Sequence, residues 1–292
     1  MRNVKQVTEA IGRTAHLDLA WAAFQSFAGL PMNFPIHRQI RKIPTAQGLI
    51  WSQMWTHDLA QAAPIVLLHD ALGCVALWRD LPQQLLHATG RTVVAYDRVG
   101  FGQSSAAAGP LPLSFITDEP HQGLAAVLQA WELETFVALG HSVGGSMALC
   151  AAAAYPQQCK SLITLAAQTC VEARTTAGIR LAQQQFAQPG AMERLAKYHG
   201  NKADWVLNAW TQTWLSDAFA DWNLNAILPQ VTCPTLVIHG ELDEYGSLQH
   251  PKTIARGVQA PATVEIIPNC GHMPHKEHAS YCLEVMAAHL AE

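Results

Sequence analysis

The sequence is poor in charged residues. Asp, Glu, Lys and Arg make up 14% of the 292 residues, whereas an average globular chain contains about 25%. The formal net charge is -4, and the basic residues form no stripe or cluster. Nucleic acid is therefore not expected as a partner, because binding it requires such a surface. With 50% hydrophobic residues, the chain is expected to fold around a substantial core rather than remain disordered.

The sequence also lacks paired cysteines and a membrane-spanning run. Its seven cysteines stand singly with no Cys-x-x-Cys pair, which argues against zinc and dithiol motifs and indicates reduced thiols. The longest apolar stretch near the start, residues 17–30, contains Asp18, Gln25 and Ser26, and no clean small-x-small cleavage site follows it. We therefore predict a cytoplasmic protein with no membrane partner, in which residues 1–35 form a helical extension.

Short β-rich runs and helical stretches alternate along most of the chain. After an antiparallel opening pair, strands are expected at residues 65–68, 92–96, 136–139, 161–166, 235–239 and 263–267. This alternation predicts a mainly parallel sheet with helices on both faces. Between residues 171 and 228 strands give way to helices rich in Gln, Ala and Trp. We predict that this stretch is a helical lid inserted into a core of residues 36–170 and 229–292.

One motif lies between an apolar strand and a helix of small residues: Gly140-His141-Ser142-Val143-Gly144. A Gly-x-Ser-x-Gly sequence in this context predicts a sharp strand-to-helix turn that exposes the serine hydroxyl as a nucleophile. The following helix would direct its positive N-terminal end toward developing negative charge. The Val143 N–H is accordingly predicted to be one donor of an oxyanion hole.

A serine hydroxyl needs a base to accept its proton and a carboxylate to orient that base. Asp243 follows the strand at 235–239 and His272 follows the strand at 263–267, so both lie at the carboxyl ends of strands. We predict Ser142, Asp243 and His272 as the catalytic residues, with Glu244 as the rival for the acid.

The three histidines His272, His275 and His278 suggest a metal site as an alternative. No Cys partner or His-Glu-x-x-His pattern accompanies them. We therefore predict no metal, and we expect His275 and His278 at the surface or supporting the site.

The loop His69-Asp70-Ala71-Leu72-Gly73 follows the strand at 65–68 and can supply a second oxyanion donor, for which we choose the Ala71 N–H. From about residue 36 to residue 292 the chain resembles the α/β-hydrolase superfamily. The landmarks that carry this resemblance are residues 69–73, 97–104, 140–145, 240–243 and 271–272, in that order.

The resemblance implies an α/β-hydrolase fold with a mostly parallel eight-stranded sheet, a serine triad, a lid that forms the substrate pocket, and no cofactor. Asp70 departs from the family pattern, because many members have Gly after the histidine. Asp70 is then either an acid near the reaction centre or a cap of the following turn.

Several reactions occur on this scaffold. Ser142 argues against haloalkane dehalogenases and epoxide hydrolases, which use an aspartate nucleophile. The family's carbon-carbon bond hydrolases usually have Asn before the serine and Trp after the histidine, where this chain has His141 and Met273. We predict a carboxylesterase-like enzyme (EC 3.1.1) that cleaves an ester, lactone or related acyl bond through an acyl-enzyme. Carbon-carbon bond hydrolysis, cofactor-free perhydrolysis and ligand binding without turnover stay as alternatives.

The expected partner is a small-molecule substrate, and a homodimer is considered as the assembly. Tryptophans near helical spacing are more typical of packing within the lid than of contact with a substrate. Arg98 or Arg174 could hold a substrate carboxylate, although Arg98 could instead brace its own loop together with Asp97. The candidate substrate-binding residues are His69, Trp78, Arg98, Gln168, Tyr198, Trp210 and Trp214.

Overall fold

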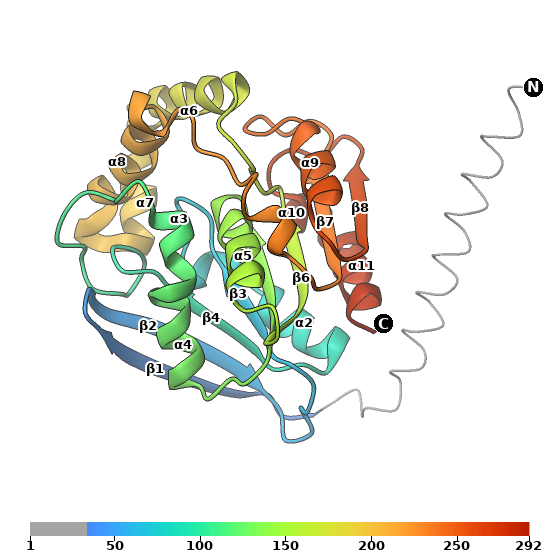
Figure 1. Ribbon diagram of the computed structural model, residues 1–292. Helices are drawn as coiled ribbons and strands as arrows, with labels where there is room; N and C mark the ends of the chain where they lie inside the picture. The colour runs from blue at the N-terminus through green and yellow to red at the C-terminus, as the bar shows by residue number, and fades with distance from the viewer. Residues whose placement is uncertain (1–33, 292) are drawn as a thin grey trace, which may run out of the picture.

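The computed structural model describes residues 34–291, in which a central sheet is flanked by helices (Figure 1). The sheet order is β1-β2-β4-β3-β5-β6-β7-β8, and β2 alone runs antiparallel to its neighbours. The predicted α/β-hydrolase fold, with a mostly parallel eight-stranded sheet, is confirmed. The strands are β1 (His37–Thr45), β2 (Gly48–Thr56), β3 (Ile65–Leu68), β4 (Val93–Asp97), β5 (Phe136–His141), β6 (Cys159–Leu165), β7 (Thr235–Gly240) and β8 (Ala262–Ile267).

The central strands are buried on both faces because their side chains alternate between two hydrophobic clusters. Val66 and Leu68 of β3 belong to one cluster, and Ile65 and Leu67 to the other. Each cluster is completed by helices on its own face of the sheet. Those on the first face are α4 (Gly123–Ala130), α5 (Val143–Ala154) and α9 (Gln249–Gly257), and those on the second are α2 (Leu81–Thr89) and α11 (Ala279–Ala291).

Three further helices gather at one end of the molecule in Figure 1. They are α6 (Ala173–Phe186), α7 (Ala191–His199) and α8 (Ala203–Trp214), and they lie in the stretch predicted to be a lid, which we call the helical segment 171–228. An isolated bridge between Cys170 and Asn223 joins the two ends of this segment.

Several helices between the strands are short or divided. The stretch near residues 78–89 forms a 3-10 turn, η2 (Val75–Trp78), and then α2, because Arg79 between them has a positive φ of 55°. The stretch at 121–131 is divided into η3 (Glu119–His121) and α4, with α3 (Phe115–Asp118) before them. The remaining short helices are η4 (Gly200–Lys202), η5 (Asp217–Phe219), η6 (Leu228–Gln230) and α10 (Pro274–Glu277).

The helical extension predicted for residues 1–35 lies outside the described residues, apart from Phe34 and Pro35. Within residues 34–291, no helix combines the length and the apolar character needed to cross a membrane.

Candidate active site

The chain turns from strand to helix within a single residue at Ser142. This serine has φ 55° and ψ -125°, a conformation that residues with a Cβ rarely adopt. The turn requires glycine on both sides: a Cβ on Gly140 would collide with the Gly144 carbonyl, and one on Gly144 with the Leu68 carbonyl. The strained turn therefore holds Ser142 at the N-terminus of α5.

The structure brings Ser142, His272 and Asp243 together as a hydrogen-bonded series. His272 Nε2 lies 2.9 Å from Ser142 Oγ, and His272 Nδ1 lies 2.9 Å from each carboxylate oxygen of Asp243. A carboxylate accepts hydrogen bonds, so Nδ1 carries the ring proton and Nε2 is free to accept the serine proton. Glu244, the rival acid, is exposed, whereas Asp243 is fully buried.

The neighbours of the imidazole favour its charged form. Burial alone would lower the pKa of His272, but the hydrogen bond and negative charge of Asp243, together with Glu244 and Asp70, raise it above its ordinary value. Burial alone would raise the pKa of Asp243, but His272 and the Tyr245 N–H outweigh burial and lower it. Asp243 is therefore ionised and stabilises a proton on His272.

Two backbone N–H groups border the same space as the serine. Ala71 and Val143 line a cavity of about 100 Å³ together with Ser142 and His272. Within the described chain, neither the Ala71 N–H nor the Val143 N–H has a hydrogen-bond acceptor. Both groups are thus available to an oxygen atom that enters this cavity.

A second cavity of about 410 Å³ adjoins the first. Ala71, Val143, Trp210 and Trp214 line both cavities, so a ligand at Ser142 can extend from one into the other. The walls of the larger cavity come from the β1–β2 turn, the loop after β4, α3, the start of α5, and α8 of the helical segment 171–228.

Four of the seven predicted substrate-binding residues line these cavities. Trp210 and Trp214 border both, Gln168 lies 3.5 Å from Ser142 Oγ in the smaller one, and Arg98 borders the larger one. Arg98 also braces its surroundings, because its Nη2 donates to the carbonyl of Asp70 at 2.9 Å.

The other three predicted residues line neither of these two cavities. Trp78 is buried in the cluster formed with α2 and α11, on the opposite face of the sheet from α5. His69 turns inward and accepts a hydrogen bond from the Arg98 N–H. Tyr198 accepts a hydrogen bond from the Arg79 guanidinium near the surface. Side-chain direction, which spacing along the chain does not encode, accounts for all three positions.

One residue of the site was missed. The Tyr245 ring contacts the His272 ring edge-on at a centroid distance of 4.8 Å and lines the smaller cavity; its place two residues after the predicted acid was an available signal. Of the two places expected for His275, the structure shows the supporting one, because His275 is buried against His141 with a centroid distance of 4.6 Å.

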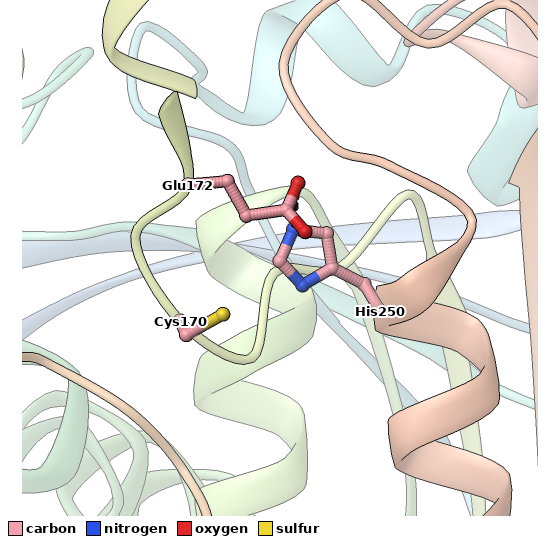
Figure 2. Close-up of side chains that lie close together, drawn as sticks. All are labelled: Cys170, Glu172 and His250. Atoms are coloured by element: carbon pink, nitrogen blue, oxygen red, sulfur yellow. Dashed lines mark ion pairs between the residues drawn. The ribbon is translucent and has the colours of Figure 1, made fainter. Parts of the chain in front are cut away.

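One cluster within residues 34–291 combines groups that metals prefer. The ligand atoms of Cys170, Glu172 and His250 lie within 4.8 Å of one another (Figure 2). His250 Nδ1 accepts the Thr169 N–H at 3.1 Å, which leaves the ring proton on Nε2, 3.2 Å from the Glu172 carboxylate. Both Glu172 oxygens also accept hydrogen bonds from Ser247. Neither ring nitrogen offers a free lone pair, so this cluster ties the start of α6 to α9 rather than forming a metal site.

Comparison with known families finds a match to the family model described as alpha/beta hydrolase fold, over residues 63–226. A curated relative from Pseudomonas sp. (strain CF600), 2-hydroxymuconate semialdehyde hydrolase, is 26% identical over 270 residues, covering 81% of this chain and 89% of that protein.

A second curated relative, 1-acylglycerol-3-phosphate O-acyltransferase ABHD5 of Rattus norvegicus, is 31% identical over 114 residues. This alignment covers 39% of the chain and spans 32% of the length of that protein. Among solved structures, the enol-lactonase from Burkholderia xenovorans LB400 superposes with a TM-score of 0.67 at 17% identity, covering 86% of this chain and 100% of that one. Likeness at this level of identity concerns the fold alone.

Proposed function

The chain belongs to the α/β-hydrolase fold family, and from this premise we propose that it is a hydrolase that cleaves an ester, lactone or related acyl bond of a small, largely apolar molecule. The observation that carries this proposal is the hydrogen-bonded series from Ser142 through His272 to Asp243. It lies beside two backbone N–H groups that have no acceptor in the described chain.

The proposed reaction has two halves. His272 Nε2 takes the proton from Ser142 Oγ as this oxygen attacks the acyl carbon, and Asp243 stabilises the imidazolium. The N–H groups of Ala71 and Val143 hold the oxyanion. His272 then protonates the leaving alcohol oxygen, the acyl carbon–oxygen bond breaks, and an acyl-enzyme remains. Water attacks this ester in the same way, which releases the acid and returns the proton to Ser142.

The larger cavity favours a neutral acyl group. Its described walls carry two ionisable side chains, Arg98 and Glu119, and both are already engaged. Arg98 donates to the Asp70 carbonyl and to Met147 Sδ, and Glu119 accepts the Tyr96 hydroxyl at 2.6 Å. The one guanidinium nitrogen of Arg98 without a partner in the described chain is Nε, which is buried, whereas an apolar chain would contact the surrounding indole and aliphatic groups.

Filling the larger cavity should shorten the preferred acyl chain. Ala209 is buried on α8 and lines this cavity, so Ala209→Phe places a ring in the space proposed for the acyl group. We expect kcat/KM for p-nitrophenyl octanoate to fall by at least about tenfold while that for the acetate changes little. Asn208→Phe, an exposed position on the same helix, is the control and should leave both values unchanged. Equal losses on both esters in Ala209→Phe would contradict this placement of the acyl group.

The pH dependence of hydrolysis should have an acid limb set by His272. The base must be neutral to accept the serine proton, and its pKa is raised above 6.5 by Asp243, so activity should be lost as the pH falls through that raised value. The measurement is kcat/KM for a neutral ester as a function of pH. An acid limb well below pH 6.5 would show that His272 is not the titrating base.

Carbon-carbon bond hydrolysis is the second candidate. It is favoured by the similarity to 2-hydroxymuconate semialdehyde hydrolase over most of both chains. His141 and Met273 stand where such enzymes usually carry Asn and Trp, which favours the acyl substrate instead. Comparing kcat/KM for a dienoate ring-cleavage product with that for a p-nitrophenyl ester separates the two, because a higher value for the dienoate would reverse our order of preference.

A further inference from the structure

A second histidine–carboxylate pair lies beside the proposed triad. Asp70 Oδ2 is 3.2 Å from His141 Nδ1, although 71 positions separate the residues. On the opposite side of the ring, His141 Nε2 lies 2.8 Å from the backbone carbonyl oxygen of His272. The His141 side chain is 1% exposed and that of Asp70 is 23% exposed, so the pair is largely shielded from water.

Both hydrogen-bond partners of the His141 ring are acceptors. A carboxylate and a backbone carbonyl can both only accept, so each ring nitrogen must donate, which is the pattern of an imidazolium. Burial alone would raise the pKa of Asp70, but the hydrogen bond and charge of His141 hold it well below its usual range. With both ring nitrogens of His141 donating, the imidazolium offsets the negative charge of Asp70.

The pair joins the three segments that carry the proposed reacting groups. Asp70 directly precedes Ala71, and its Oδ1 accepts the Leu72 N–H at 2.9 Å, which fixes the oxyanion loop. His141 directly precedes Ser142. The Nε2–H of His141 donates to the backbone carbonyl of His272, the proposed base. Movement of any one segment would therefore stretch a charge-assisted contact.

We propose that Asp70 and His141 act as one positioning unit. The unit holds the oxyanion donors, the nucleophile and the base in their relative positions. His141 also offsets the negative charge that Asp70 would otherwise present to the developing oxyanion. This inference rests on the proposed serine-hydrolase function. Small displacements of reacting groups lower the rate more than they weaken binding, so the loss should be in kcat. Asp70 thereby has a role that a simple turn cap lacks.

The pair also acts on the base through its charges. The negative charge of Asp70 contributes to the raised pKa of His272, after the larger effects of burial and Asp243. His275, against His141, has its pKa lowered by burial and by the charge of His141, so it adds no second cation. Removing the charge of Asp70 should lower the pKa of His272, whereas removing His141 should raise it. The other ionisable groups with an electrostatic interaction with Asp70 or the base are His69, Cys74, Arg98, His199, His239, Asp243, Glu244, Tyr245 and His250.

The test compares Asp70→Asn, His141→Asn and the double variant, with p-nitrophenyl butyrate as the substrate. Each single substitution should lower kcat by about 10–100-fold with little change in KM. The acid limb of kcat/KM should move to lower pH in Asp70→Asn, which loses a negative charge, and to higher pH in His141→Asn, which leaves that charge unpaired. Because the residues act as a unit, the double variant should lose about as much kcat as one single variant.

The structure offers a matched control in the exposed pair of His37 and Asp58, 3.1 Å apart. Asp58→Asn and His37→Asn should leave kcat and the acid limb unchanged. The proposal would be overturned if the kcat losses of the two single variants multiplied in the double variant. It would also be overturned if Asp70→Asn or His141→Asn folded normally and kept the wild-type kcat and acid limb. The rate of labelling by a fluorophosphonate probe separates the two hypotheses: an unreactive wild type defeats the proposed function, whereas equal labelling rates in wild type and variants defeat the positioning unit alone.

Discussion

Ser142→Ala should abolish covalent labelling by a fluorophosphonate probe and lower kcat for p-nitrophenyl esters by about four to six orders of magnitude. The substitution removes the only atom to which His272 Nε2 is hydrogen-bonded in the described structure, so no acyl-enzyme can form. The oxyanion donors and the cavities stay in place, and a small residual rate should come from them. Labelling is measured by mass spectrometry of the intact protein.

Ser114→Ala is the control for this experiment, because Ser114 is an exposed serine that bonds only within its own turn around α3. It should be labelled as fast as the wild type. Persistent labelling of Ser142→Ala would remove Ser142 from the proposed role. A wild type that is stabilised against heat by an ester but neither labelled nor active would instead favour a ligand-binding protein.

Asp243→Asn should lower kcat by about 10⁴-fold near neutral pH without unfolding the protein. An amide is nearly the same size as the carboxylate, but it cannot stabilise a positive imidazole, and it can reverse which ring nitrogen carries the proton. The backbone N–H groups of Tyr245 and Gly246, which donate to Asp243 Oδ1, can still bond the amide oxygen. The measurement is kcat for a p-nitrophenyl ester, with a thermal melt to confirm folding.

Glu244→Gln is the matched control, since the two acids are adjacent in the chain but only Asp243 contacts the His272 ring. Glu244→Gln should change kcat by less than about threefold. It should also move the acid limb of the pH profile slightly to lower pH, because the charge of Glu244 contributes to the raised pKa of His272. If Glu244→Gln were the damaging substitution and Asp243→Asn the mild one, the acid would have been assigned to the wrong residue.

The fold could be predicted because each of its elements is encoded locally. The wholly apolar run at Ile65–Leu68 indicates a strand buried on both faces. Because similar short runs alternate with helical stretches along the chain, the pattern predicts a mainly parallel sheet. The convergence of Ser142, Asp243 and His272 follows from that topology, because β5, β7 and β8 all run in the same direction and end at the same edge of the sheet.

Helix boundaries and side-chain directions could not be predicted in the same way. Trp78 looked suitable for a cavity wall, but the positive φ of Arg79 ends its turn before α2 begins, and the indole is buried on the other face of the sheet. The two adjoining cavities depend on how α8 packs over the loop after β4, which involves residues about a hundred positions apart.

The amino-acid sequence by itself determined the sheet, the strand-to-helix turn at Ser142 and the order of the proposed catalytic residues, because hydrophobic periodicity and glycine placement act over a few neighbouring positions. Only the tertiary structure decided which groups surround them. The pairing of Asp70 with His141, and of His141 with the carbonyl of His272, depends on contacts between segments 71 and 131 positions apart, for which no local pattern exists.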